Sequence, residues 1–297
     1  MIDKLEMFIA LANEQHFGRA ALACGVTQPT LSAAIKQLED QLGVQLVRRG
    51  SRYQGLTPEG VRALEWAHRI AGDARTMRAE LRMAHAGLSG NLRLAVIPTA
   101  LAMVEALTRP LLASHPNLAV TVHSRTSTAV RAMVEGLEAD AGITYLHGEP
   151  PGRLMSVALY RERYFLIVPA GSHLADRPVV TWAEVATRPL CLLTEDMQNR
   201  RIINGHLAEA GARASPRLAS NSGIALVAHV RAGGWETVLP RATAVLFDDE
   251  RRFAAIPIDS PGDGHPVGLI AEPREPHTPV LGAFIAAAEA MGRQIDR

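Results

Sequence analysis

The sequence has few cysteines and few aromatic residues, and it lacks long apolar runs. Its two cysteines, Cys24 and Cys191, are too few for a disulfide framework. No uninterrupted apolar stretch reaches the roughly 18 residues of a membrane-spanning helix, and the amino terminus does not resemble a signal peptide. We therefore expect a cytoplasmic protein. Aromatic residues make up 4% of the chain, which argues against a single-strand nucleic-acid binder that stacks bases on exposed rings.

The sequence also lacks the local motifs of common enzyme classes. It contains none of the patterns HExxH, CxxC, GxSxG and GxxxxGK[ST], which mark zinc, redox, nucleophile-elbow and phosphate-binding chemistry. We expect no metal, no cofactor and no catalytic residue. A hydrolase whose catalytic groups lie far apart in the sequence stays open as an alternative.

Charge of one sign does not dominate. The 297 residues, enough for two or three domains, contain 31 Lys and Arg against 30 Asp and Glu, for a net charge of +1. This balance excludes a globally basic nucleic-acid coat but not a local basic patch. Residues 1–60 carry six basic and six acidic residues. Any DNA affinity of this segment must therefore come from local placement and from the pairing of two copies.

The first 60 residues predict a helix–turn–helix. Ala21 lies four residues before Gly25, and a small residue followed by a glycine permits close helix approach and a left-handed turn. Thr27 is placed to cap the next helix, and Pro29 is tolerated in its first turn. Apolar residues at helical spacing then predict one buried stripe: Leu31, Ile35, Leu38 and Leu42.

The remaining face of this second helix carries short polar groups near its amino end. Such groups suit base edges and phosphates in the major groove of DNA. The candidate DNA-binding residues there are Thr27, Gln28, Pro29, Thr30, Ser32, Ala33 and Lys36. Residues 46–56 then predict a two-stranded wing, whose arginines can reach phosphates or the minor groove: Arg48, Arg49 and Arg52. A solvated hairpin without a role in DNA binding is the alternative for this segment.

A long helix is predicted after the wing. Thr57 is a cap, Pro58 suits the first helical position, and only Gly72 interrupts the pattern before Gly87. About 29 residues of helix span about 43 Å. Its apolar stripe favours pairing with a second copy: Val61, Leu64, His68, Ala71, Ala74, Met77 and Leu81. Packing on its own domain is the alternative, and residues 87–90 predict a hinge.

Residues 91–297 alternate between apolar strands and helices, which predicts parallel sheets with right-handed crossovers. The expected strands are 92–97, 118–124, 141–144, 164–169, 190–193, 217–220, 237–239 and 267–271. The expected helices are 100–114, 127–138, 200–210, 223–232 and 280–294, with a short helix that a capping box opens at Thr181. Two lobes joined by crossing strands would enclose a cleft lined by helix amino termini, which suits small anions.

Residues 1–60 resemble the winged helix–turn–helix of LysR-type transcriptional regulators. The shared pattern is Phe8, Phe17, Ala20, Ala21, Gln28, Pro29, Leu31, Ser32, Ile35, Leu38, Glu39, Leu42, Gly43, Leu46, Arg49, Leu56, Thr57 and Gly60. His16 and Val47 depart from it, because the family has a small hydroxyl residue and a phenylalanine there. Residues 91–297 resemble the effector-binding domain of the same family, itself similar to periplasmic binding proteins, through the stretches 93–99 and 135–143.

The resemblance implies an N-terminal all-α winged helix–turn–helix with a long linker helix, then a C-terminal α/β effector domain of two Rossmann-like lobes. The expected limits are 1–58, 59–90 and 91–297, with lobe I at 91–163 and 267–297 and lobe II at 164–266. It implies that the protein is a bacterial regulator and not an enzyme. It also implies that the protein binds an interrupted palindrome in promoter DNA as a homodimer or homotetramer. A small-molecule effector is a further partner, and RNA polymerase is a candidate one. A solute-binding module with a vestigial DNA unit is the alternative.

The resemblance also places effector-binding residues in the cleft: Thr99, Thr126, Ser127, Gln198, Asn199, Arg200 and Asn221. Their hydroxyl and amide groups suit a carboxylate or an oxyanion, with Arg200 or Arg201 as countercharge. Each of the hydroxyl and amide residues is alternatively a helix cap, Asn221 among them. Cys191 is expected to be a buried, inert thiol, because a peroxide sensor needs a resolving cysteine in the same domain.

Overall fold

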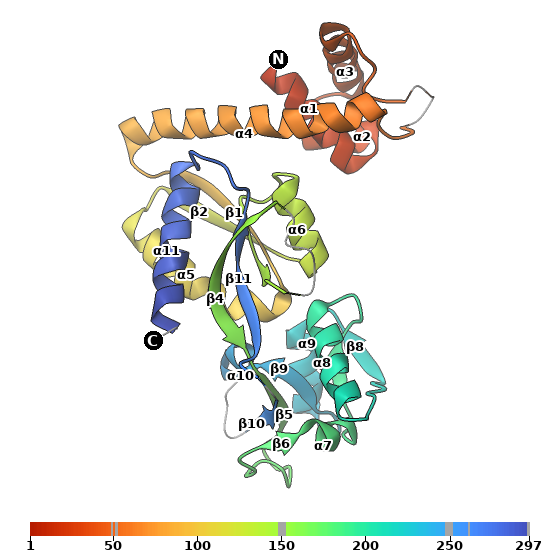
Figure 1. Ribbon diagram of the computed structural model, residues 1–297, viewed down its shortest axis with the longest axis vertical. Coiled ribbons are helices and arrows are strands. Elements are labelled where there is room, and N and C mark those ends of the chain that lie inside the picture. The colour runs from red at the N-terminus through yellow and green to blue at the C-terminus, as the bar shows by residue number, and fades with distance from the viewer. Residues whose placement is uncertain (49, 51–52, 148–152, 247–251, 261, 296–297) are drawn as a thin grey trace. The chain divides into compact units, whose positions relative to one another are not determined.

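The structure of the protein is a computed structural model, and it describes residues 1–48, 50, 53–147, 153–246, 252–260 and 262–295. The chain forms two compact units (Figure 1). The first comprises residues 1–89 with 276–279, and the second comprises residues 90–275 with 280–297.

The first unit is helical, and local sequence explains where its helices start and stop. Its helices are α1 (Ile2–Glu14), α2 (Phe17–Ala23), α3 (Gln28–Leu42) and α4 (Pro58–Ala86). The hydroxyls of Thr27 and Thr57 cap α3 and α4, as the sequence predicted. Gly25 and Gly43 follow the ends of α2 and α3 and adopt left-handed backbone conformations, with φ of 66° and 70°.

The core of this unit forms where α1, α2 and α3 meet. Phe8, Leu11, Leu31 and Leu38 are fully buried in it, together with Ile35 at 3% exposed. The predicted stripe of α3 is thus confirmed at its first three positions. Its fourth position was wrong: Leu42 is 45% exposed, because it lies in the last turn of α3, next to the Gly43 cap.

Helix α4 has the 29 residues that the sequence predicted, and Gly87 ends it. The predicted stripe does not form one face. Ala71 and Ala74 are buried, whereas Val61, Met77 and Leu81 are more than half exposed. Exposed apolar side chains follow one another at spacings of four, seven and four residues along the helix: Trp66, Ile70, Met77 and Leu81.

The first lobe of the second unit is built on a five-stranded sheet in the order β2-β1-β3-β11-β4. Its strands are β1 (Gly90–Val96), β2 (Leu118–Ser124), β3 (Ala141–Tyr145), β4 (Met155–Glu162) and β11 (His265–Ala271). The first three strands are parallel, and β11 runs antiparallel to both β3 and β4. Helices α5 (Leu101–Ser114) and α11 (Pro279–Ile295) lie on one face of the sheet and α6 (Ser127–Glu135) on the other (Figure 1).

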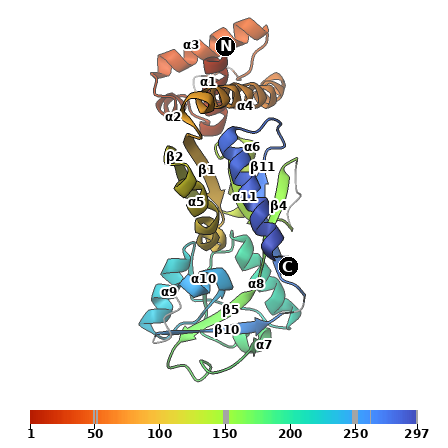
Figure 2. The same ribbon diagram turned by 90° about the vertical axis from the view of Figure 1, so that its left-hand side faces the viewer.

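The second lobe contains a four-stranded sheet in the order β6-β10-β5-β9 and a parallel pair, β7 and β8. Its strands are β5 (Tyr164–Pro169), β6 (Val180–Thr181), β7 (Cys191–Leu193), β8 (Leu218–Ser220), β9 (Thr237–Pro240) and β10 (Phe253–Asp259). Its helices are α7 (Trp182–Ala186), α8 (Gln198–Glu209), α9 (Gly223–Ala232) and α10 (Arg241–Leu246). Helices α9 and α10 pack on β5 and β9, whereas α7 and α8 pack against each other (Figure 2).

The two lobes are joined by crossing segments that the sequence predicted only in part. Strand β4 runs into β5 through Arg163, and β10, which ends at Asp259, is followed in the chain by β11, which begins at His265. The prediction had β5 but missed β4, which ends in the charged residues Arg161 and Glu162, and β10, where Pro257 interrupts the apolar run. It also extended α6 to residue 138. The helix ends at Glu135, since Gly136 follows and Leu137 adopts a left-handed φ of 54°.

Candidate functional site

The amino-terminal half of α3 presents short side chains to solvent. The hydroxyl of Thr27 accepts a hydrogen bond from the Thr30 amide at 3.4 Å and lies 2.9 Å from the Thr30 hydroxyl. All seven residues predicted for this surface are at least partly exposed: Thr27, Gln28, Pro29, Thr30, Ser32, Ala33 and Lys36. Because Leu31 and Ile35 anchor the opposite face in the core, the exposed face has a fixed direction.

His16 has a definite structural role where it departs from the family pattern. It is the N-cap residue of α2, and its ring nitrogen Nδ1 accepts hydrogen bonds from the amides of Gly18 at 3.0 Å and Arg19 at 3.3 Å. A serine or threonine would supply the same acceptor through its hydroxyl. The imidazole therefore replaces the usual hydroxyl without loss of the cap.

The base of the wing is tied to α3 and α4. The carboxylate of Glu39 accepts hydrogen bonds from the amides of Leu46 at 2.7 Å and Val47 at 3.1 Å. Gly60, in the first turn of α4, lies against the same segment: a Cβ at this position would be 2.0 Å from the Leu46 carbonyl oxygen. The glycine is therefore required by close backbone approach rather than by φ.

Within the wing, the structure describes one of the three predicted arginines. Arg48 donates from its amide to the Gly55 carbonyl at 3.0 Å and from Nε to the Leu56 carbonyl at 3.2 Å. Val47 and Leu56 form an antiparallel bridge, and Tyr53 packs edge-on against Phe17 at 6.5 Å between ring centroids. Arg49 and Arg52 lie outside the described residues.

In the second unit, a small cavity of about 10 Å³ lies between the two lobes. Thr99, next to the start of α5, and Ser127, the first residue of α6, line it from the first lobe. Gln198 and Asn199, the first residues of α8, line it from the second. All four were predicted for this site, and all are buried. A cavity of this size holds about one water-sized group.

Side-chain hydrogen bonds link the two lobes around this cavity. Gln198 Nε2 donates to the His147 carbonyl at 2.7 Å, and Thr243 Oγ1 donates to the Thr99 carbonyl at 3.2 Å. Asn199 Nδ2 donates to the Tyr145 hydroxyl at 3.5 Å. The site therefore depends on how the lobes are placed against each other, which is what a ligand-sensing cleft requires.

A buried carboxyl group lies beside these residues, and sequence reasoning missed it. Glu162, the last residue of β4, is 1% exposed. Its Oε1 accepts hydrogen bonds from the hydroxyls of Tyr145 and of Tyr164, the latter at 3.1 Å. Burial raises the pKa of Glu162 to about 7, although the hydrogen bonds from Tyr145 and Tyr164 act to lower it.

Three other predicted effector residues are placed differently. Thr126 caps α6, accepting from the Ala129 amide at 3.3 Å. Arg200 is 3% exposed and donates to the Leu193 carbonyl and to Asn204 Oδ1, so its guanidinium is bound within the second lobe. The expected cap at Asn221 was wrong, because Ser222 holds the N-cap position of α9, and Asn221 is exposed.

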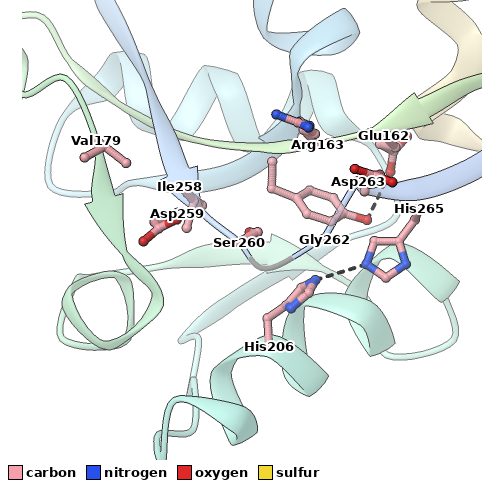
Figure 3. A pocket seen from close by; sticks show the side chains of 12 residues that line it. Glu162, Arg163, Val179, His206, Ile258, Asp259, Ser260, Gly262, Asp263 and His265 are labelled. Atoms are coloured by element: carbon pink, nitrogen blue, oxygen red, sulfur yellow. Dashed lines mark hydrogen bonds between the residues drawn. The ribbon is translucent and has the colours of Figure 1, made fainter. Parts of the chain in front are cut away.

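A larger cavity of about 310 Å³ opens where the crossing segments meet the second lobe. His206 rises into it from α8, and His265 faces it from the start of β11 (Figure 3). The His206 ring stacks on Trp182 with centroids 4.9 Å apart and planes 14° apart. The sequence offered only scattered histidines here, without a spacing that would bring these two together.

Cys191 is a buried thiol in β7, as the sequence predicted. It is 0% exposed, and its Sγ lies 3.8 Å from the Leu226 carbonyl. Burial raises the pKa of the Cys191 thiol, which lowers its thiolate fraction and hence its reactivity.

Among the described residues no helix is both long and apolar enough to cross a membrane.

A winged helix–turn–helix followed by a two-lobed α/β domain with a polar site between its lobes defines a ligand-responsive DNA-binding regulator. Two family models match the chain: "Bacterial regulatory helix-turn-helix protein, lysR family" over residues 2–61 and "LysR substrate binding domain" over residues 85–293. The chain therefore belongs to the LysR family of transcriptional regulators. It is not an enzyme, and the two parts of the chain are a DNA-binding domain and an effector-binding domain.

Individual relatives agree with this assignment. The dual regulator OxyR of Escherichia coli K12 is 29% identical over 299 residues, which cover 99% of this chain and 96% of OxyR. The regulator XapR of the same organism is 35% identical over 173 residues, which cover 58% of this chain and 59% of XapR. A cysteine-to-aspartate variant of full-length OxyR from Pseudomonas aeruginosa has the same fold, with a TM-score of 0.75, 23% identity and 99% of each chain covered. CbnR has a TM-score of 0.62, with 22% identity and 98% of this chain and 99% of CbnR covered.

Proposed function

We propose that the exposed half of α3 reads operator DNA and that the polar site between the lobes binds the effector. The observation that carries the DNA half is the fixed, solvent-facing row of short polar residues from Thr27 to Lys36. Short side chains allow the helix to enter the major groove, where Gln28, Thr30 and Ser32 can hydrogen-bond to base edges. Pro29 and Ala33 supply close apolar contact. Lys36 and the wing arginines Arg48, Arg49 and Arg52 contact phosphates.

The pairing of two chains supplies the affinity that a neutral DNA-binding unit lacks. The exposed apolar row of α4 (Trp66, Ile70, Met77, Leu81) forms a narrow stripe along one side of the helix and suits a second copy of the same helix. Two recognition helices about 34 Å apart then meet two half-sites of an interrupted palindrome. The proposed domain limits are 1–58 for DNA binding, 59–90 for the linker and 91–297 for the effector domain. The protein works in the cytoplasm as a homodimer or homotetramer, with RNA polymerase as a further partner.

The effector half of the proposal rests on the buried polar atoms between the lobes. Thr99 Oγ1, Ser127 Oγ and Gln198 Oε1 have no partner within the described structure. Each such atom costs about 1–3 kcal/mol unless something bonds to it. A ligand that bonds to these atoms binds one arrangement of the lobes more tightly than another and so shifts the chain toward that arrangement. The crossing segments transmit this change in lobe arrangement to the DNA-bound chains. In this proposal Asn199 contacts the ligand, and Thr126 and Asn221 lie beside it. Arg200 supports the segment between β7 and α8 through its hydrogen bond to the Leu193 carbonyl.

The effector signal does not come from a pair of cysteines. Several relatives are named hydrogen peroxide-inducible genes activators. Cys191 is the only cysteine after Cys24 in this sequence, so residues 91–297 hold no second thiol with which to form a disulfide. Because Cys191 is also buried with a raised pKa, we propose that this protein responds to a bound ligand and not to thiol oxidation.

The experiment selects operator sequences from a random DNA pool with the wild-type chain and then measures binding by variants at several salt concentrations. Gln28→Ala is expected to cost about 1–3 kcal/mol on the selected site and to relax one base position. Lys36→Ala is expected to weaken binding to all sequences and to flatten the salt dependence. Asp40→Asn, on the same helix but beyond the proposed contacts, is the control. Selection of no sequence, or unchanged binding by both variants, refutes the DNA half of the proposal.

A further inference from the structure

Three of the unpartnered atoms at the inter-lobe site can only accept hydrogen bonds, whereas the unpartnered hydroxyls of Thr99 and Ser127 can donate or accept. Gln198 Oε1, Asn199 Oδ1 and Glu162 Oε2 are buried and have no partner in the described structure. The sequence suggested an anionic effector, which would itself supply only acceptors. The direction in which each amide points therefore decides which chemistry the site can bind.

The amide of Gln198 has a fixed direction. Its Nε2 lies 2.7 Å from the His147 carbonyl oxygen. A carbonyl oxygen can only accept a hydrogen bond, so the amide nitrogen must face it. Gln198 Oε1 is thereby left as an acceptor, and a rotated amide would set two oxygens against each other.

Asn199 is oriented through Tyr145. The Tyr145 hydroxyl has one proton, and the ionised Glu162 carboxylate can only accept it. The Tyr145 oxygen then accepts from Asn199 Nδ2, which lies 3.5 Å away. Asn199 Oδ1 is therefore also left as an acceptor facing the site.

Glu162 adds a negative charge near these two oxygens: its carboxylate is bonded to Tyr145, which lines the cavity, although Glu162 itself does not. The groups that contact its carboxylate are neutral side chains, namely those of Tyr145 and Tyr164. With neutral partners, the charge of Glu162 repels a second anion placed among the same residues, and desolvation strengthens this repulsion. A ligand with N–H groups meets the opposite conditions, since it can donate to Gln198 Oε1 and Asn199 Oδ1 in the cavity wall, and a cationic one is attracted by the charge of Glu162.

We propose that the effector presents a neutral amide-like or cationic amidine-like N–H group to the inter-lobe site and that Glu162 is the residue that rejects anions there. This inference rests on the proposed role of the same site in effector binding. The cavity of about 10 Å³ takes only the head of such a ligand, and larger groups enter as the lobes separate. Pro98 lines this cavity and also a second cavity of about 430 Å³. The walls of the second cavity include Leu101, Ile224 and Leu246, so it suits the apolar part of such a ligand.

The test uses probes of one shape that differ in charge and donors. Acetate, acetamide and acetamidine form one set, and benzoate, benzamide and benzamidine form a larger one. The midpoint of thermal unfolding of the full-length chain is measured with each probe at equal ionic strength and about pH 8, where a Glu162 with a pKa of about 7 is ionised. The amide or the amidine is expected to raise the midpoint, and the carboxylates are expected to leave it unchanged.

Variants separate the charge of Glu162 from a general change of stability. Glu162→Gln keeps the shape and removes the charge, so amidine binding is expected to weaken about tenfold or more and carboxylates are expected to be tolerated. Glu105→Gln, which removes an exposed carboxylate from α5, is the control and is expected to bind like the wild type. Thr99→Ala is expected to abolish any shift that arises in this site.

Each outcome decides between the two proposals. A midpoint raised by a carboxylate and lost in Thr99→Ala overturns the ligand class and keeps the effector site. No Thr99-dependent shift with any of the six probes overturns the acceptor-rich site. If an amide or amidine binds but operator binding does not change with it, the ligand class stands and the proposed regulation fails.

Discussion

The Nε2 atoms of His206 and His265 lie 3.0 Å apart, within hydrogen-bond distance of each other (Figure 3). One of the two nitrogens must carry a proton and the other must be free for this contact to form. His206 belongs to α8 and His265 to the segment that returns to the first lobe. Their contact thus ties a helix of the effector site to one of the two crossings.

Acid is expected to weaken this contact. Burial and then the neighbouring His206 lower the pKa of His265. The folded chain therefore binds this proton less readily than the unfolded chain, whose His265 has its ordinary pKa of 6.5. The stabilisation is present above that pH and is lost as the pH falls below it. The thermal midpoint of His265→Gln should fall less steeply with acid than that of the wild type, and parallel curves would contradict the assignment.

Glu162 is expected to give the opposite pH dependence. Its pKa rises from an ordinary 4.5 to about 7 in the folded chain, so the folded state holds the proton more tightly. Its contribution to stability is complete below about pH 4.5 and is lost as the pH rises through about 7, a change of about 3 kcal/mol. The difference in unfolding free energy between wild type and Glu162→Gln should follow this window. The same difference measured with Glu105→Gln should be flat, and a flat curve for Glu162→Gln would refute the raised pKa.

The cap at His16 gives a prediction for the DNA-binding domain. His16→Ala removes the acceptor for the Gly18 and Arg19 amides and is expected to destabilise the domain by about 1 kcal/mol. His16→Ser is expected to restore most of this loss, because a hydroxyl supplies the same acceptor. Chemical denaturation of the three proteins measures the effect. Equal stability of the alanine and serine variants would show that capping is not the role of His16.

Gly60 and Gly205 form a matched pair of helical glycines. A methyl group at Gly60 would overlap the Leu46 carbonyl, whereas one at Gly205 meets nothing within 4 Å. Gly60→Ala is therefore expected to cost about 3 kcal/mol and to displace the wing. Gly205→Ala is expected to be neutral or to stabilise α8 by up to about 1 kcal/mol. Thermal unfolding and operator affinity report the two effects, and a well-folded Gly60→Ala with full affinity would contradict the predicted overlap.

The exposed row on α4 predicts the oligomeric state. Leu81 is 64% exposed and Met77 53% exposed. Leu81→Glu should cost the single chain little stability but place like charges together in a paired helix. Sedimentation should then show a shift toward monomer and operator affinity should fall, whereas Glu80→Gln on the neighbouring face should change neither. An unchanged oligomer in Leu81→Glu would mean that the chains associate elsewhere.

Local sequence signals predicted the parts of the fold that depend on adjacent residues. The caps at Thr27, Thr57 and Thr181 were confirmed because a hydroxyl and the amides it accepts from lie within three residues of each other. Strand β2 and helix α9 had the predicted bounds. Strand β4 was missed because its pairing with β11 involves residues about 100 positions away.

The candidate site could be predicted only in part for the same reason. Thr99, Ser127, Gln198 and Asn199 stand at helix starts, which a pattern of strands and helices can locate. Glu162 could not be found in this way, since nothing in its neighbourhood shows that its carboxyl group turns inward. Its burial depends on Tyr145, which lies 17 residues away on a different strand.

The place of β11 in the first sheet sets an order of assembly during synthesis. This strand lies between β3 and β4, and every strand of the second lobe precedes it in the chain. As the chain leaves the ribosome, the second lobe can thus complete its sheets while β3 and β4 still lack the strand that joins them. The lobe nearer the amino terminus is therefore the last to close, and a chain that stops before residue 265 would keep two unpaired strand edges open to aggregation.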